Sequence, residues 1–213
     1  MKKVIVVGST KGGAGKTTLV IHLAAYHERL GGKVLIVEVD PSGASKMWVT
    51  LRKSSNIVVK HYKTDLDLAD EMIRLKEEYS DHLVIVDCGG FDNKAMRTAI
   101  TSRATDAVII PSKPSLIDLA VARPFIIQTA KALEGKKPLR GCIMEANPLP
   151  NMAKEIWDTK AAMEKFGMTP LVNLTYKRNA YKENYLDGGD GLSHNSKALD
   201  DIKAIYEEIN SLT

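Results

Sequence analysis

Short runs of apolar, β-branched residues alternate along the chain with longer amphipathic stretches. Several of the short runs are apolar almost throughout, as expected of strands that are buried on both faces. The predicted strands are residues 3–8, 33–39, 56–60, 83–87, 107–110, 141–145 and 170–173. The predicted helices are residues 16–30, 66–79, 93–103, 115–133, 152–166 and 196–212. This alternation predicts an α/β fold with a doubly wound, mostly parallel sheet and helices on both faces.

The composition narrows the class of protein further. The chain has 213 residues, of which 44% are hydrophobic and 26% charged, so it is expected to fold as a globular protein. No apolar run approaches the roughly 20 residues that a membrane-spanning helix needs. Without repeats or a long linker, residues 1–213 are predicted to form a single domain. Two cysteines, Cys88 and Cys142, are too few for a disulfide framework or a zinc site, and we interpret them as reduced, buried thiols.

The strongest motif lies directly after the first predicted strand and directly before the first predicted helix. The segment GSTKGGAGKTT, residues 8–18, fits the phosphate-binding pattern G-x-x-x-x-G-K-[ST]. Its glycines allow backbone N–H groups to approach phosphate oxygens, and the helix start adds a positive dipole end. Lys16 is expected to reach the β- and γ-phosphates of ATP, Thr17 to bind Mg²⁺, and Thr18 to lie at the α-phosphate. The remaining nucleotide-binding candidates of the loop are Gly12, Gly13, Ala14 and Gly15.

Two aspartates stand where predicted strands end. Asp87 closes the apolar run 83–87, and Asp40 closes the run 34–40. Ligands of open α/β sheets bind at the carboxyl ends of the strands, so both side chains are candidates for holding Mg²⁺. Asp40 is also a candidate for orienting the attacking water. The structural alternative for each residue is a helix N-cap.

The string KGGAGKTT, residues 11–18, resembles the deviant phosphate-loop (Walker A) form of the ParA/MinD family of ATPases. The resemblance implies that Lys11 reaches across a dimer interface to the partner's nucleotide. Asp40 and the following proline are similar to the family's D-x-D-P-Q switch segment. The chain departs from that pattern at Glu38, which replaces the first aspartate, and at Ser42, which replaces the glutamine. Segments 109–118 and 174–188 resemble those of small ParF-like plasmid partition proteins.

The resemblance also implies roles for two later segments. Asn147 lies where the family contacts adenine, although an Asn-Pro turn explains the same residues. Lys177, Arg178 and Lys182, interleaved with tyrosines, are similar to a basic surface that contacts DNA phosphates without regard to sequence. A solvated surface is the alternative for this cluster. The net charge of +4 permits an acidic partner such as DNA without requiring one.

Taken together, the resemblance implies a ParA-type partition or positioning ATPase that converts ATP to ADP and phosphate. Lys11, Lys16 and Asp40 are the expected catalytic residues. The expected partners are a second copy in an ATP-bound homodimer, nonspecific DNA and a ParB-like or other cargo-bound activating protein. The expected location is the cytoplasm, at the nucleoid, and the cargo is a plasmid, a chromosome region or a protein assembly. Because the first strand starts at residue 3, no N-terminal helix-turn-helix domain is expected.

Two other functions remain open from the sequence. A MinD-like ATPase that cycles on membranes would need a basic amphipathic helix at the C-terminus, whereas residues 198–210 are amphipathic and acidic and would be repelled by anionic lipids. A metabolic ATP-dependent enzyme on the same scaffold is also possible, because fold does not fix function. No signature of a substrate pocket supports that second alternative.

Overall fold

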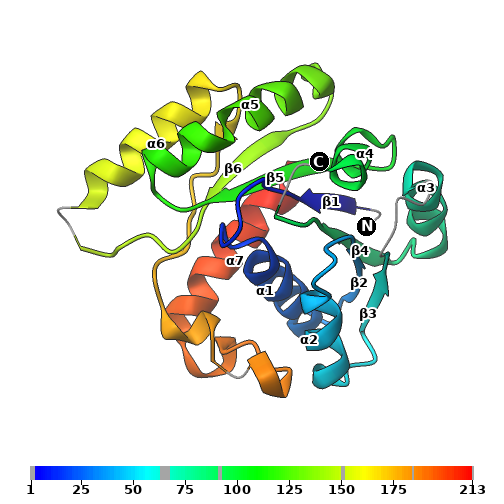
Figure 1. Cartoon of the computed structure of the whole chain (residues 1–213). Coiled ribbons are helices and arrows are strands. Elements are labelled where there is room, and N and C mark those ends of the chain that lie inside the picture. The colour runs from blue at the N-terminus through cyan, green and yellow to red at the C-terminus, as the bar shows by residue number, and fades with distance from the viewer. Residues whose placement is uncertain (1–2, 63–67, 91–92, 150–151, 184, 213) are drawn as a thin grey trace.

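A parallel β-sheet forms the centre of the protein in the computed structural model, which describes residues 3–62, 68–90, 93–149, 152–183 and 185–212. Within those residues the sheet has seven strands in the order β3-β2-β4-β1-β5-β6-β7 (Figure 1). Each neighbouring pair is parallel. The strands are β1 (Lys3–Val7), β2 (Lys33–Glu38), β3 (Ile57–His61), β4 (His82–Asp87), β5 (Ala107–Ser112), β6 (Leu139–Ile143) and β7 (Thr169–Pro170). The predicted fold class is confirmed.

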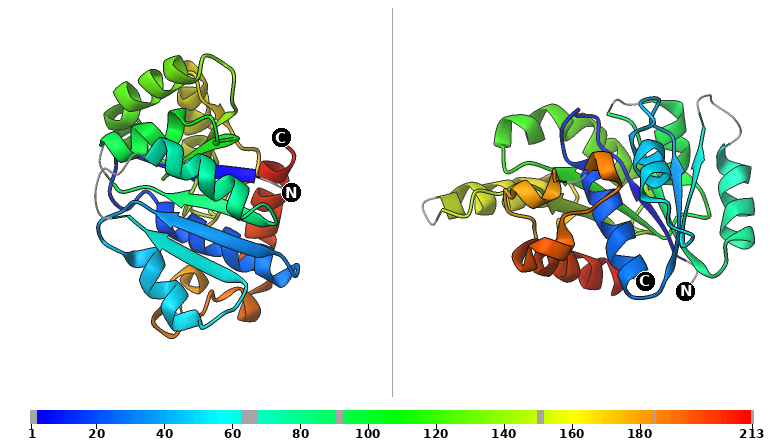
Figure 2. Two further views of the ribbon diagram at one scale, coloured as in Figure 1. Left: turned by 90° about the vertical axis from the view of Figure 1, so that its right-hand side faces the viewer. Right: turned by 90° about the horizontal axis from the view of Figure 1, so that it is seen from below.

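Helices cover both faces of this sheet, as the views in Figure 2 show. One face carries α1 (Lys16–Arg29), α2 (Ala44–Arg52) and α7 (Ser196–Asn210). The other face carries α3 (Leu68–Glu78), α4 (Lys94–Thr101), α5 (Leu116–Leu133) and α6 (Ala153–Lys165). Three short 3₁₀ helices lie between β7 and α7: η2 (Asn179–Tyr181), η3 (Tyr185–Asp187) and η4 (Leu192–His194).

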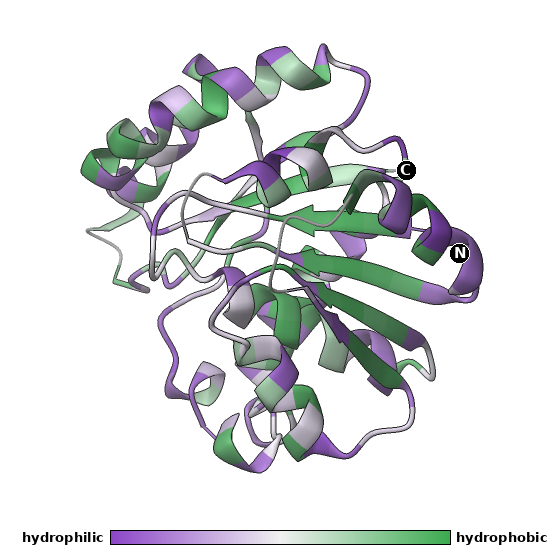
Figure 3. Ribbon diagram, turned by 45° about the vertical axis from the view of Figure 1, so that its right-hand side comes forward, coloured by the Kyte–Doolittle hydropathy of each residue, from purple (hydrophilic) through white to green (hydrophobic). Residues whose placement is uncertain are grey.

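The alternation of side chains along the strands explains why two cores form. In β1, Val4 and Val6 pack toward the α3–α6 face, whereas Ile5 and Val7 pack toward the face of α1, α2 and α7. The strands are hydrophobic along nearly their whole length (Figure 3), as expected when helices cover both faces. The amphipathic α7 buries four apolar side chains and is therefore a packing helix, as predicted. In the described part of the chain, no helix is both long and apolar enough to cross a bilayer.

Helix α2 is absent from the sequence-based prediction. Its nine residues are short for a helix and begin after Gly43, whose positive φ of 68° is typical of a turn. Its stability comes from tertiary contacts, chiefly from Trp48, which is completely buried. The other six helices match their predicted positions to within a few residues. Positions 66 and 67, at the predicted start of the helix that corresponds to α3, lie outside the described residues.

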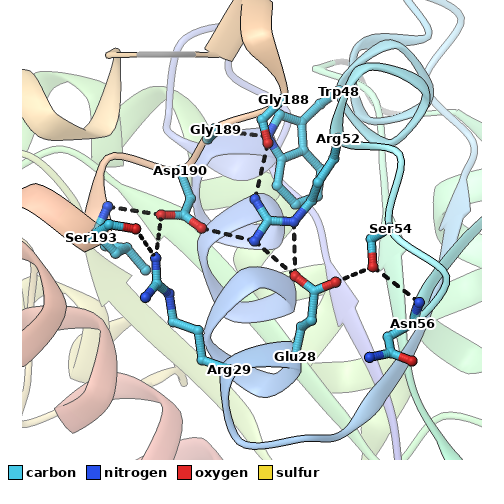
Figure 4. A network of polar contacts seen from close by, with 11 residues as sticks. Glu28, Arg29, Trp48, Arg52, Ser54, Asn56, Gly188, Gly189, Asp190 and Ser193 are labelled. Carbon is cyan, nitrogen blue, oxygen red and sulfur yellow. Dashed lines mark hydrogen bonds and ion pairs between the residues drawn. The ribbon is translucent and has the colours of Figure 1, made fainter.

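A buried polar network ties α2 to α1 and to the segment that precedes η4 (Figure 4). The Arg52 guanidinium donates to the Glu28 carboxylate at 2.8 Å and to the Asp190 carboxylate at 3.0 Å. Arg29 donates to the second Asp190 oxygen at 3.0 Å. The Asp190 side chain is only 3% exposed, so these two arginines compensate a charge that water cannot reach. The loop approaches so closely that a Cβ on Gly188 would lie 2.2 Å from the Arg52 backbone nitrogen.

Candidate nucleotide site

The predicted phosphate loop connects β1 to α1 at the carboxyl edge of the sheet. Gly13 and Gly15 have positive φ values of 72° and 94°, a conformation that glycine adopts without strain. Helix α1 begins at Lys16 without a side-chain cap and without an acidic residue in its first turn. Its first N–H groups are therefore available to an anion. They border a cavity of about 300 Å³ lined by Gly12, Gly13, Gly15, Lys16, Thr17, Thr18, Asp40 and Gly90.

Lys16 is almost fully buried inside this loop, with 6% of its surface exposed. Its ammonium group donates to the Lys11 carbonyl oxygen at 3.0 Å. Burial lowers the pKa of Lys16, and the negative charges of Asp87 and Asp40 act in the opposite direction. Gly90 lies against the same group, because a Cβ added there would stand 3.4 Å from the Lys16 nitrogen. The Lys16 ammonium group is thus a charged hydrogen-bond donor that is shielded from water, and such a group is suited to binding the phosphates of a nucleotide.

Asp87 ends β4 and is completely buried. One carboxylate oxygen, Oδ2, accepts a hydrogen bond from the Ser45 hydroxyl, whereas the buried Oδ1 has no hydrogen-bond partner among the described residues. Burial raises the pKa of Asp87 to about 7, and the neighbouring hydroxyl groups of Ser45 and Thr17 oppose that shift. A buried carboxylate oxygen that has no hydrogen-bond partner and lies beside a phosphate loop is a suitable ligand for Mg²⁺.

The described residues contain no group of three His, Cys, Asp or Glu side chains arranged to hold a metal by themselves. Mg²⁺ in nucleotide enzymes is held by one or two protein groups, by phosphates and by water. Thr17, Asp40 and Asp87 would be those protein groups. Asp40 lies on the same cavity as Thr17. Its Oδ1 accepts from the Ser42 backbone N–H at 2.8 Å, which orders the loop after β2.

Lys11 extends from the phosphate loop toward α5, where its ammonium group pairs with the Asp118 carboxylate of the same chain. The side chains are 40% and 21% exposed. An ion pair this open to water is worth at most about 1 kcal/mol, so Lys11 can leave it for a stronger partner. Ser115 caps α5 by accepting from the Asp118 N–H at 3.2 Å.

Asn147 is exposed at the end of β6, three residues after Met144. Met144 lies beneath the phosphate loop, because a Cβ added to Gly15 would stand 3.0 Å from its side chain. The Asn147 side chain accepts from the Leu149 N–H at 3.1 Å, which is the predicted turn. The neighbouring Ala146 forms a β-bridge with Tyr176. Asn147 and the segment after β7 are thereby brought to one place beside the loop.

The three basic residues of that segment do not behave alike. Lys177 and Lys182 are exposed. Arg178 instead forms a two-pronged ion pair with Asp201 of α7, at 2.8 and 3.0 Å, and its side chain is 19% exposed. The structure thus gives Arg178 a packing role on α7, and its predicted contact with DNA stays a prediction. Tyr181 is buried beside the same aspartate.

The sequence analysis did not predict the roles of two residues of the site, Ser45 and Glu38. Ser45 touches Asp87, from 42 positions away in the chain. Glu38 was noted only as a departure from the family pattern, and the structure shows its carboxylate accepting the first N–H groups of α2. No local pattern marks Ser45, because the helix that carries it was itself not predicted. Cys88 and Cys142 are buried free thiols, as expected.

Comparison with known proteins agrees with this site. Residues 5–210 match the family described as the CobQ/CobB/MinD/ParA nucleotide binding domain, and the chain belongs to this family. It is 26% identical over 211 residues to maintenance of carboxysome distribution protein A of Halothiobacillus neapolitanus, covering 96% of this chain and 95% of that protein. It is 25% identical over 198 residues to protein ParA of Rhizobium radiobacter, covering 91% and 87% of the two chains.

Among solved structures, the fold is similar to the septum site-determining protein MinD of Pyrococcus horikoshii OT3, complexed with Mg-ADP. The TM-score is 0.74 at 18% identity, and the match covers 100% of this chain and 97% of that one. The seven-stranded parallel sheet with helices on both faces is therefore the fold of MinD and ParA proteins. The family consists of nucleotide-binding proteins that include partition and positioning ATPases.

Proposed function

We propose that this protein is a ParA-type positioning ATPase, whose ATP-bound dimer binds DNA without sequence preference and releases it after hydrolysis. The observation that carries the proposal is the presence of Lys11 in a phosphate loop whose cavity is lined by Lys16 and Asp40. Asp87, whose negative charge acts on Lys16, keeps one buried oxygen without a partner among the described residues. The relatives that it resembles over nearly their full length are named for carboxysome distribution and as ParA.

Each residue has a distinct part in this proposal. The loop N–H groups and Lys16 hold the phosphates, while Thr17, Asp40 and Asp87 hold Mg²⁺. When bound, Mg²⁺ neutralises charge that develops on the transferred phosphoryl group. Asp40, which lines the cavity together with Gly90, orients the attacking water. Lys11 exchanges its exposed partner Asp118 for the nucleotide of a second copy. ADP and phosphate are the products.

DNA contact is assigned to Lys177 and Lys182. Both are exposed and belong to the segment that meets Asn147 beside the nucleotide site. Such lysines would contact phosphates as point charges, so binding would fall with salt and would not depend on sequence. A ParB-like or other cargo-bound protein would stimulate hydrolysis and end the DNA-bound state. The proposed location is the cytoplasm, at the nucleoid.

The test is sedimentation of the purified protein with random-sequence duplex DNA, with ADP or with ATP and Mg²⁺, over a series of salt concentrations. We expect salt-sensitive binding only with ATP. The double variant Lys177→Glu, Lys182→Glu should lose this binding. Lys136→Glu is the matched control, because it reverses an equally exposed charge whose side chain is 75% exposed and lies away from the site.

Three results would contradict the proposal. Binding that is equal with ADP and ATP would contradict the switch, and unchanged affinity in the double variant would place the DNA surface elsewhere. Binding to anionic liposomes in place of DNA would favour the membrane-cycling alternative. The acidic α7 speaks against that alternative, because anionic lipids repel acidic helices.

A further inference from the structure

We infer that Ser45 is a positioning residue for the Asp87 carboxylate, and that Glu38 holds Ser45 in place. The inference rests on the proposed function, because it concerns how the chain prepares Asp87 for Mg²⁺. It assigns a role to two residues that the phosphate-loop chemistry leaves unused.

The contact between Ser45 and Asp87 is buried on both sides. Ser45 lies in the first turn of α2 with none of its surface exposed, and its hydroxyl donates to Asp87 Oδ2. A carboxylate held at one oxygen cannot rotate freely, so the direction of the other oxygen becomes fixed. That other oxygen is the buried Oδ1, for which the described part of the chain supplies no donor. Ser45 therefore aims the free oxygen.

The Glu38 carboxylate holds Ser45 in its position beside Asp87. Glu38 and Asp87 are register partners on the adjacent strands β2 and β4. The fully buried Glu38 carboxylate accepts from the Ser45 N–H at 2.9 Å and from the Lys46 N–H at 3.0 Å. It thus caps α2, whose N-cap residue Gly43 offers no side chain for this purpose. The positive end of the helix also compensates the charge of Glu38 beside Asp87.

The length of the glutamate side chain is needed for this cap. An aspartate at position 38 would be one methylene shorter and would leave both α2 N–H groups without this acceptor. The chain therefore carries a matched pair, with Glu38 reaching to the helix and Ser45 reaching back to the neighbouring strand.

The rest of α2 is held firmly enough for Ser45 to act as a fixed donor. The Tyr185 hydroxyl donates to the Ala44 carbonyl oxygen at 2.6 Å. The buried Trp48 donates from its indole nitrogen to the Gly189 carbonyl oxygen at 2.8 Å. Arg52 anchors the last turn through the network drawn in Figure 4. Both ends of the helix are thus fixed by groups outside it.

The experiment measures the affinity for a fluorescent ATP analogue, once with Mg²⁺ and once with EDTA. Second-layer hydrogen bonds to metal ligands are typically worth about 10- to 100-fold in metal affinity. For Ser45→Ala we expect the Mg²⁺ concentration at half-saturation to rise about 10-fold, at the lower end of that range. Affinity in EDTA should be unchanged, because it depends on the loop and Lys16. Ser45→Thr keeps the hydroxyl and should restore the wild-type value.

Two further variants sharpen the test. Glu38→Asp should reproduce much of the Ser45→Ala defect, because the shorter carboxylate no longer caps α2. Thr50→Ala removes an exposed hydroxyl that bonds only to the Lys46 carbonyl oxygen of the same helix, and it should behave as wild type. Circular dichroism verifies that each variant is folded.

The outcomes separate the two proposals. A wild-type protein whose nucleotide affinity ignores Mg²⁺ would overturn the proposed function itself. A Mg²⁺-dependent wild type with an unchanged Ser45→Ala variant would overturn only the role of Ser45. Equal losses with Mg²⁺ and with EDTA would show that Ser45 merely supports the fold, and would also overturn that role.

Discussion

Lys16 at the start of α1 and Asp87 at the end of β4 are buried groups of opposite charge, and the negative charge of Asp87 raises the pKa of Lys16 against the effect of burial. Neither has a full set of partners within the described residues, since Lys16 donates to one carbonyl oxygen and Asp87 Oδ1 accepts nothing there. Buried polar groups in this condition are costly unless a ligand completes them. At the scale of single residues, the site is therefore suited to a ligand that places an anionic group at Lys16 and a cation at Asp87.

Replacing Lys16 by alanine should weaken ATP binding by roughly 10- to 100-fold or more, the range expected for losing a hydrogen bond to a charged group. Isothermal titration calorimetry measures the change. Lys33→Ala is the control, because Lys33 is 51% exposed and pairs with Asp81 at the opposite edge of the sheet. ATP binding that survives in Lys16→Ala would contradict the assignment of the phosphate loop.

The pKa of Asp87 predicts how stability without nucleotide and Mg²⁺ depends on pH. Between its ordinary value of 3.8 and about 7, folded Asp87 keeps a proton that the unfolded chain releases. The contribution of Asp87 to the free energy of unfolding is complete below pH 3.8 and is lost as the pH rises through about 7. At about 1.4 kcal/mol per unit, the loss amounts to at most about 4 kcal/mol. Urea denaturation at several pH values should show a steeper decline for wild type than for Asp87→Asn, and parallel profiles would contradict the shift.

The element that matters most for the site is α2, which contacts both Asp87 and the segment that follows β7. Its first turn contacts Glu38 and Asp87, and its last turn is bound through Arg52 to Glu28 and Asp190. The same helix thus touches the switch segment and the loop that leads to η4.

Arg52→Ala should destabilise the protein by about 3–5 kcal/mol, because it leaves the buried Asp190 and Glu28 charges with fewer partners. Chemical denaturation measures the difference. Arg74→Ala serves as the control, since Arg74 also pairs with two carboxylates but lies 56% exposed on α3. We expect no change in its unfolding midpoint. Equal effects of the two substitutions would show that the buried network adds nothing.

The elements that sequence could predict are those whose signal is local. The buried strands, the long amphipathic helices and the phosphate loop between β1 and α1 each occupy one continuous stretch. Helix α2 was missed because its stability depends on contacts that Trp48 and Arg52 make with the Gly189 and Gly188 carbonyl oxygens, 141 and 136 positions away. The ion pair of Arg178 was not predicted for the same reason, since Asp201 follows in a separate helix. Such pairings are decided by the folded chain.

At the scale of the whole molecule, the site opens at one edge of the sheet, where the ends of β1, β2 and β4 meet. Lys11, Asp40 and the exposed Asn147 lie at this edge. The side chain of Ile117, early in α5 next to Asp118, is 78% exposed. This arrangement is consistent with a second copy covering the site, as the proposed function requires.

Asp40→Ala should produce a stable dimer with ATP and Mg²⁺, because phosphate contacts survive while the orientation of water is lost. Size-exclusion chromatography with light scattering should then report twice the monomer mass of 23.4 kDa. Lys11→Ala should remain monomeric under the same conditions while keeping its fold. A monomeric Asp40→Ala protein, or a dimeric Lys11→Ala protein, would contradict the roles given to these residues.

The uncapped start of α1 has a consequence for handling the purified protein. Its first-turn N–H groups have neither a side-chain cap nor an acidic neighbour. Any small tetrahedral anion that reaches them stabilises the folded chain in proportion to the logarithm of its concentration. Melting temperatures recorded in phosphate or sulfate buffers will therefore exceed those in chloride buffers of the same ionic strength. The choice of buffer becomes part of every comparison between variants of this loop.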